Sequence, residues 1–179
     1  EKIILSVGRF EPSLNVKKQD VLITVFKKIS STLSDWKLVL VGGSTEDSWI
    51  KELNNQAAGY NIDILPNVDS TTLVDLYGKA SIYWHAAGYG VDEARSPELV
   101  EHFGISTVEA IAARAIPLVY RAGGQTEIVK HDDLLWETID ELVNKTINLT
   151  TKSFNDYESV LKIDSFSEEA FKNTLKTLL

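Results

Sequence analysis

The chain has 179 residues, of which 44% are hydrophobic and 25% charged, with a formal net charge of −8 and no cysteine. This length suits one domain with a sizeable core, so we predict a single domain over residues 1–179. The negative charge argues against non-specific nucleic-acid binding, and the missing cysteines exclude disulfides, thiol nucleophiles and cysteine zinc sites. With no apolar run of membrane-spanning length and no signal-peptide pattern, we expect a soluble cytoplasmic protein.

Apolar runs of strand length alternate with helical patterns along most of the chain. The runs, each bounded by glycine or polar turns, cover residues 2–8, 37–43, 62–65, 81–86 and 116–120. Nearly continuous apolar runs are typical of strands that are covered on both faces. Apolar stripes with helical spacing lie between them, for example over residues 21–29 and 73–77. The alternation predicts an α/β domain with an open parallel sheet, whose ligand binds at the carboxyl ends of the strands.

The second half of the chain is more helical. Ile139, Leu142, Val143 and Ile147 are spaced as one helix face. A last helix is predicted over residues 167–179, preceded by Ser165 and Glu168 with capping-box spacing. Residues 88–99 contain two glycines, a proline and several charges, so they predict a long loop that overhangs the strand ends.

Basic residues follow the first predicted strand. This strand ends at Gly8, Arg9 comes next, and Lys17 and Lys18 open the following helix. A guanidinium group and an ammonium group together suit a diphosphate, although three solvated surface charges are the simpler alternative. The segment is neither a Walker loop nor a GxGxxG fingerprint. Gly42 and Gly43, after the second strand, permit close approach of a ligand or of another backbone segment, although a plain strand-to-helix turn explains two glycines equally well.

The segment "EHFGISTVEA" places two carboxylates, Glu101 and Glu109, around a predicted helix start at Ser106. The free amide groups of such a first turn form a site for a phosphate. Ser106 and Glu109 also fit a capping box, which is a purely structural role for Glu109. The capping box leaves Glu101 without an explanation.

The two glutamates, separated by seven residues, resemble the E-x7-E motif of the retaining glycosyltransferases of GT-B fold, the "glycosyl transferases group 1" type. Further motifs occur in the same order as in that family. They are "SVGRF" with Lys17, "LVLVGG", "LVDLYGKASIYWHA", "IPLVYRAGGQTEIV" and "LLWETIDEL". The resemblance covers about residues 2 to 150. It implies a Rossmann-like three-layer domain with a parallel sheet, the C-terminal, donor-binding half of a GT-B enzyme, followed by C-terminal helices.

The resemblance also implies roles for individual residues. Arg9 and Lys17 are expected to bind the diphosphate, Glu101 the donor sugar and Glu109 the ribose. The remaining expected contacts with donor or nucleotide are Gly8, Gly42, Val68, Leu73, Phe103, Gly104, Ile105 and Ser106. We expect no cofactor and no metal, since the chain has no Asp-x-Asp pair; the substrate is a nucleotide sugar such as a UDP- or GDP-sugar.

Three positions depart from the family pattern. Lys18 and Arg114 stand where glycine is common, and the loop between Ile128 and Leu134 is short and lacks its usual glycines. No acceptor-binding domain precedes Glu1, so we expect an N-terminal domain of the same parent chain as a partner. The full-length enzyme is then a retaining, hexosyl-type transferase, peripheral on the inner face of the membrane through that domain, and the isolated chain is expected to bind donor without transferring sugar.

Two alternatives remain at this stage. The chain could be a non-catalytic nucleotide or sugar-phosphate binding module of the same fold. A receiver-type domain is less favoured because it needs clustered aspartates at the strand ends. Of the histidines, none has metal-ligand spacing; His85 is either a core residue or a sugar contact, and His102 receives no role.

Overall fold

In the computed structural model, which describes residues 1–12 and 16–162, a parallel sheet forms the centre of the molecule. Its strands are β1 (Ile3–Val7), β2 (Lys37–Gly42), β3 (Ile62–Pro66), β4 (Ile82–His85), β5 (Ile116–Tyr120) and β6 (Leu135–Trp136). The strand order is β3-β2-β1-β4-β5-β6, and every neighbouring pair is parallel. The first five strands confirm the five predicted runs, and β6 is too short for a periodic signal.

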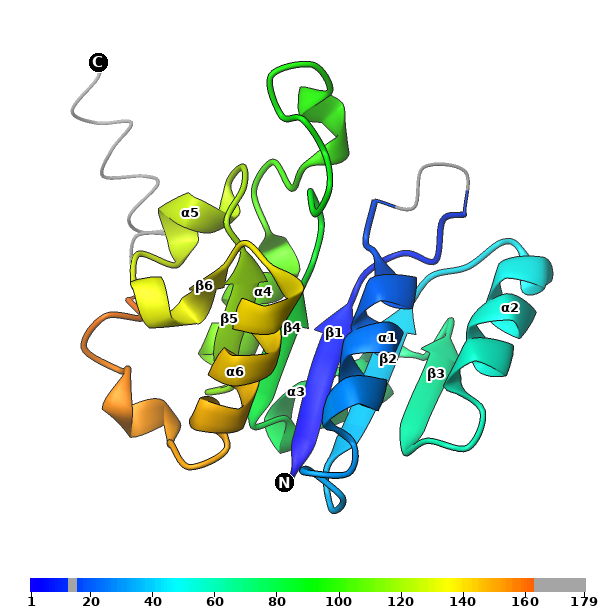
Figure 1. The fold of residues 1–179 in the computed structure, drawn as a ribbon, viewed down its shortest axis with the longest axis horizontal. Coiled ribbons are helices and arrows are strands. Elements are labelled where there is room, and N and C mark those ends of the chain that lie inside the picture. The colour runs from blue at the N-terminus through cyan, green and yellow to red at the C-terminus, as the bar shows by residue number, and fades with distance from the viewer. Residues whose placement is uncertain (13–15, 163–179) are drawn as a thin grey trace.

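Helices cover both faces of this sheet (Figure 1). One face carries α1 (Gln19–Ile29), α2 (Asp47–Ala57) and α6 (Ile139–Leu149), and the other carries α3 (Ser70–Lys79) and α4 (Ile105–Ala112). A short helix α5 (Gln125–Ile128) follows β5. Three single turns complete the elements: η1 (Pro97–Leu99), η2 (Asp132–Leu134) and η3 (Phe154–Asp156). The α/β, Rossmann-like prediction is therefore confirmed.

The alternation of side chains along each strand produces the two layers of core. Ile4 of β1 packs in the layer under α1 and α6, whereas its neighbour Leu5 packs in the layer with α3 and α4. In β4, Trp84 and Tyr83 divide in the same way. All four side chains are fully buried. This burial on both faces explains why the strands are apolar throughout rather than alternating.

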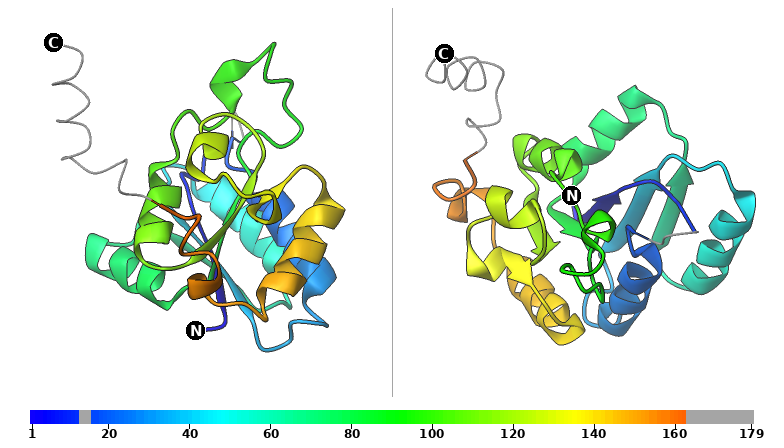
Figure 2. Two further views of the ribbon diagram at one scale, coloured as in Figure 1. Left: turned by 90° about the vertical axis from the view of Figure 1, so that its left-hand side faces the viewer. Right: turned by 90° about the horizontal axis from the view of Figure 1, so that it is seen from above.

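The strand order sets where a ligand can bind. β1 and β4 are neighbours at the centre of the sheet although they are far apart in sequence, and the strand order reverses between them. In sheets of this kind, the connections on either side of such a reversal leave a crevice at the carboxyl ends of the strands. The chain between β4 and α4, residues 86–104, rises above this end of the sheet, as predicted for the loop over 88–99 (Figures 1 and 2).

The helix predicted to start at Ser106 begins at Ile105, with Gly104 as its N-cap residue at φ 97°. A glycine tolerates this left-handed conformation without strain. The last predicted helix, with Ser165 and Glu168, lies outside the described residues.

Candidate functional site

A cavity of about 770 Å³ lies at the carboxyl ends of the central strands. Every residue that the sequence predicted for the site lines it: Gly8, Arg9, Lys17, Gly42, Val68, Leu73, Glu101, Phe103, Gly104, Ile105, Ser106 and Glu109. These residues come from four separate parts of the chain, which lie at or after the carboxyl ends of β1, β2, β3 and β4 and include residues of α3 and α4. The fold therefore brings the predicted site residues together, while their individual roles stay predictions.

The first side of the cavity is built from two loops whose backbones touch. The amide of Gly8 donates a hydrogen bond of 2.8 Å to the carbonyl oxygen of Val41, and the amide of Phe10 donates one of 2.8 Å to Gly43. A Cβ atom on Gly42 would lie 2.0 Å from the carbonyl oxygen of Gly8. Of the reasons that the sequence left open for this glycine, the structure shows close approach of another backbone segment.

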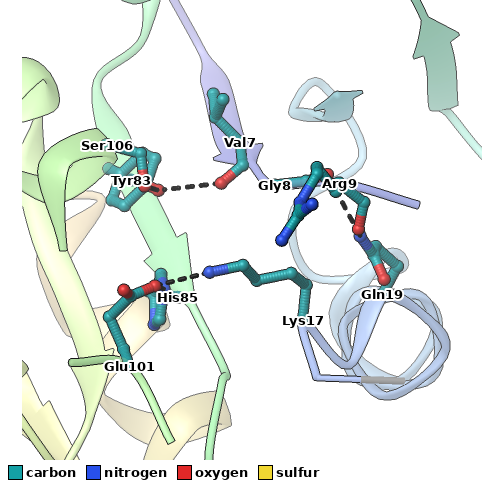
Figure 3. Close-up of polar contacts among 9 residues, drawn as sticks. All are labelled: Val7, Gly8, Arg9, Lys17, Gln19, Tyr83, His85, Glu101 and Ser106. Carbon is teal, nitrogen blue, oxygen red and sulfur yellow. Dashed lines mark hydrogen bonds and ion pairs between the residues drawn. The ribbon is translucent and has the colours of Figure 1, made fainter. Parts of the chain in front are cut away.

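Two basic residues of the β1–α1 loop, Arg9 and Lys17, face the cavity (Figure 3). The amide group of the buried Gln19 donates hydrogen bonds to the carbonyl oxygens of Gly8 (3.3 Å) and Arg9 (3.0 Å). These bonds fix the loop against the start of α1. Arg9 is exposed, and its side chain and that of Lys17 extend into the same space.

Glu101 lies opposite and forms the best-defined polar cluster of the site (Figure 3). Its Oε2 atom is 2.5 Å from Nζ of Lys17 and 3.2 Å from Nε2 of His85. The hydrogen bond from His85 and then the charge of Lys17 hold the pKa of the Glu101 carboxyl far below its usual range, against the opposing effect of burial. Glu101 is therefore an anion at neutral pH, paired with a cation from another loop.

His85 is the last residue of β4, and its side chain is only 2% exposed. Burial lowers the pKa of its imidazole, and the hydrogen bond to Glu101 offsets only part of that effect. Nδ1 has no hydrogen-bond partner among the described residues. The ring therefore lies buried behind Glu101 and does not line the cavity. Of the two alternatives for this histidine, a core position agrees with the structure.

The second wall of the cavity is the start of α4. Ser106 is the second residue of this helix, and its Oγ atom lies 2.7 Å from the hydroxyl group of Tyr83. The same hydroxyl is 3.3 Å from the carbonyl oxygen of Val7 at the end of β1. Burial raises the pKa of Tyr83, so this bridge between β1, β4 and α4 stays protonated.

The predicted capping box of Ser106 and Glu109 is wrong. α4 has no side-chain cap, because Gly104 is its N-cap residue. Glu109 instead accepts a hydrogen bond of 2.8 Å at Oε2 from the hydroxyl group of Tyr77 in α3. Burial, together with the charges of Tyr83 and Glu109, raises the pKa of Tyr77, which keeps this donor protonated.

The segment that carries Glu101 is supported from behind by the β5–α5 loop. The amide of Gly124 donates a hydrogen bond of 2.8 Å to the carbonyl oxygen of Glu101. A Cβ atom on Gly123 would lie 2.3 Å from that oxygen, and one on Gly124 would lie 2.2 Å from the carbonyl oxygen of His102. The paired glycines thus allow two backbone segments to touch, which fixes the position of Glu101.

Sequence reasoning missed several supporting residues. Tyr77 and Tyr83 were predicted only as parts of a helix and a strand, and Gln19 carried no prediction, because their polar partners cannot be recognised from the sequence. His102 received no role, yet it lines the cavity, with Nε2 3.1 Å from the carbonyl oxygen of Pro97. The side chain of Asn67 accepts a hydrogen bond of 2.9 Å from the Ser44 amide and so ties together the loops after β2 and β3.

No three His, Cys, Asp or Glu side chains within residues 1–12 and 16–162 are grouped so that they could hold a metal ion. Within the same residues, no helix has the length and apolar character needed to cross a membrane.

A sheet of this order, with a cavity where β1 and β4 meet, defines a doubly wound α/β domain. The sequence model of the family "Glycosyl transferases group 1" matches residues 1–169, and the chain belongs to this family. The family assignment predicted from the sequence is thereby confirmed.

Among curated proteins, the chain is 30% identical over 191 residues to a GDP-Man:Man(3)GlcNAc(2)-PP-Dol alpha-1,2-mannosyltransferase of Dictyostelium discoideum, covering 97% of this chain and 36% of that protein. An uncharacterized glycosyltransferase of Methanocaldococcus jannaschii is 31% identical over 74% of this chain and 30% of its own length. The chain thus spans about a third of the length of these relatives.

Among solved structures, the catalytic domain of cholesterol-alpha-glucosyltransferase from Helicobacter pylori superimposes with a TM-score of 0.65 at 23% identity, covering 96% of this chain and 98% of that one. TarM of S. aureus, in complex with UDP, gives a TM-score of 0.73 at 16% identity, covering 99% of this chain and 35% of that one. At these identities the two superpositions show the fold alone.

Proposed function

We propose that this chain is the donor-binding domain of a retaining glycosyltransferase that transfers a sugar from a nucleoside diphosphate sugar without a metal. The observation that carries the proposal is the charge arrangement in one cavity. Two cations, Arg9 and Lys17, and the amide end of α4 surround a space that Glu101 and Glu109 border. The cations and amides suit the diphosphate, and the carboxylates suit hydroxyl groups.

The cations of the cavity can stabilise the negative charge that develops on the diphosphate during transfer. When the bond between the sugar and the diphosphate breaks, its electron pair stays on the phosphate oxygen and negative charge grows there. Arg9, Lys17 and the first-turn amides of α4 are positioned to stabilise this charge, which is the role that a metal ion fills in other transferases. The lack of an Asp-x-Asp pair in the sequence supports transfer without a metal. We include retention of the anomeric configuration in the proposal because the sequence motif of Glu101 and Glu109 resembles that of retaining glycosyltransferases.

The remaining proposed contacts place the ribose, the sugar and the base of the donor at different walls of the cavity. Glu109, held by Tyr77, would accept hydrogen bonds from the ribose hydroxyl groups. Glu101 and the backbone from Phe103 to Ser106 would contact the sugar. The base would lie near Val68 and Leu73, which line the end of the cavity formed by the β3–α3 connection.

GDP-mannose is the first donor to test. Two relatives, from Dictyostelium discoideum and Xenopus laevis, are described as GDP-Man-dependent alpha-1,2-mannosyltransferases, at 30% and 29% identity. Their described acceptors are dolichol-linked glycans. We therefore propose a lipid-linked glycan as acceptor, an acceptor domain elsewhere in the parent protein, and a place for the enzyme at the cytoplasmic surface of a membrane.

Calorimetric titration of the chain with GDP, UDP and ADP tests the proposal. We expect selective binding of one diphosphate. Arg9→Ala should weaken that diphosphate by more than about tenfold and leave the matching nucleoside unchanged, because a hydrogen bond to a charged group is worth about 1.5–3 kcal/mol. Glu109→Ala should weaken both ligands.

Arg95→Ala is the matched control, since Arg95 is exposed and does not line the cavity. It should bind all ligands as the wild type does. An equal loss of nucleoside and diphosphate in Arg9→Ala would contradict the diphosphate contact. Absence of binding for all three diphosphates at millimolar concentration would contradict the donor site itself. Binding without transfer by the full-length parent would favour a non-catalytic binding module.

A further inference from the structure

The imidazole of His85 is a buried polar group beside the cavity that the proposed function does not use. Its side chain is 2% exposed and does not line the cavity. Its Nε2 atom lies 3.2 Å from Oε2 of Glu101, the same oxygen that is 2.5 Å from Nζ of Lys17 (Figure 3). Any effect of His85 on a ligand in the cavity therefore passes through Glu101.

The partner of each ring nitrogen determines the form of the imidazole. Glu101 is ionised, so it can only accept hydrogen bonds, and the Nε2 atom facing it must carry the proton. In the neutral ring Nδ1 is then a bare acceptor, and it has no partner among the described residues. A buried nitrogen without a partner costs free energy, which an apolar side chain of similar size would avoid. Packing alone does not explain a histidine at this position.

The contact matters most when a donor is bound. Lys17 then has two anionic partners, Glu101 and the diphosphate. If its ammonium group moves toward the phosphates, its contact with Glu101 is lost. His85 keeps its hydrogen bond to Oε2 in either case, since it is fixed in β4 and, being neutral, is not drawn to the phosphates. Both known contacts use Oε2, and Oε1 has no polar partner in the part of the chain that the structure describes.

We infer that His85 is a positioning residue that fixes the Glu101 carboxylate, so that Oε1 is available to a hydroxyl group of the donor sugar while Lys17 engages the diphosphate. The inference depends on the proposed donor site and adds a residue to it that does not touch the ligand. It predicts that loss of the His85 hydrogen bond lowers the affinity for ligands that carry the sugar and leaves the affinity for the diphosphate unchanged.

The test compares the affinities of GDP-mannose and GDP, or of UDP-glucose and UDP if the wild type selects uridine. His85→Leu removes the hydrogen bond, whereas His85→Gln can place an amide N–H near the position of Nε2. We expect His85→Leu to lower the affinity for the sugar nucleotide about tenfold and to leave the diphosphate unchanged, and His85→Gln to restore most of the loss. In Glu101→Gln, adding His85→Leu should cause little further loss, because the two residues act together.

The outcomes separate this inference from the proposed function. If the wild type binds none of these nucleotides, both are overturned. If it binds them and His85→Leu weakens diphosphate and sugar nucleotide equally, or neither, only the role of His85 is overturned. Should the leucine variant fail to fold, ¹⁵N NMR of the wild-type imidazole decides instead. A proton on Nε2 whose resonance shifts further with GDP-mannose than with GDP supports the inference, and equal shifts with the two ligands, or none, overturn it.

Discussion

The hydroxyl group of Tyr77 donates a hydrogen bond of 2.8 Å to Oε2 of Glu109, across the interface between α3 and α4. Tyr77 is 6% exposed, so the donor is fixed by packing, whereas Glu109 lies at the wall of the cavity. A carboxylate held by a neighbouring helix is oriented before any ligand arrives. The bond joins the two helices that flank the proposed ribose position.

Tyr77→Phe should therefore weaken nucleoside binding without changing the fold. The loss of one hydrogen bond that orients Glu109 is worth about 1 kcal/mol, so we expect about a fivefold lower affinity for both guanosine and GDP, measured by calorimetry. Tyr60→Phe is the control, since Tyr60 is exposed and does not line the cavity. Wild-type affinity for guanosine in Tyr77→Phe would show that the tyrosine has no part in ligand binding.

The sheet was predictable because its signal is local. Each of the first five strands is an apolar run of its own, and the alternation with helical stripes is enough to imply a parallel sheet. β6, with only Leu135 and Trp136, has no such pattern and forms because it pairs with Val119 and Tyr120 of β5. A strand of two residues depends on its neighbour, so the sequence alone did not indicate it.

The site was predictable as a set of residues and less so in its geometry. The family resemblance predicted a set of residues, and all of them line one cavity. It did not predict the hydrogen-bond partners of the two glutamates, which come from other elements. Tyr77 is 32 residues from Glu109, and His85 is 16 residues from Glu101. The capping box failed for the same reason, since spacing along the chain cannot reveal a competing partner from another helix.

Gly42 provides a sharp test of the backbone contact at the cavity. In Gly42→Ala the new Cβ would lie 2.0 Å from the carbonyl oxygen of Gly8, which is backbone and cannot move aside as a side chain does. We expect a loss of stability of about 3 kcal/mol in urea unfolding, together with weaker nucleotide binding. Gly78→Ala is the matched control: its Cβ meets nothing within 4 Å and it lies within α3, so a gain of about 0.5–1 kcal/mol is expected. Equal effects of the two substitutions would refute the close-contact explanation.

Lys18 occupies a position where the family commonly has glycine, and its backbone keeps the left-handed conformation at φ 53°. Arg114, the other such departure, also has a positive φ, of 68°. The backbone at these two positions thus takes a conformation that suits glycine although the side chain differs. For a residue with a side chain, this conformation costs about 1–2 kcal/mol.

Lys18→Gly should therefore stabilise the protein. Relief of strain exceeds the entropic cost of glycine, which leaves a net gain of about 0.5–1 kcal/mol in urea unfolding. The same substitution at Lys28, which is exposed in the last turn of α1, should instead destabilise by about 1 kcal/mol. A destabilised Lys18→Gly would mean that the lysine side chain contributes more than its backbone costs.

The buried imidazole of His85 should make stability depend on pH. Burial holds its pKa in the folded protein below the usual value of 6.5, so the unfolded chain takes up a proton first as the pH falls. The stability that comes from the neutral ring is complete above about pH 6.5 and is lost below it, with a limiting slope of about 1.4 kcal/mol per pH unit. Urea unfolding between pH 5 and pH 8 measures this slope.

His85→Gln should remove most of that slope, because glutamine does not titrate. The carboxylates with lowered pKa, such as Glu101, lose their contribution only in the more acidic range, so they do not obscure the step between pH 5 and pH 7. A slope that persists unchanged in His85→Gln would mean that another group causes it and that burial does not lower the pKa of His85.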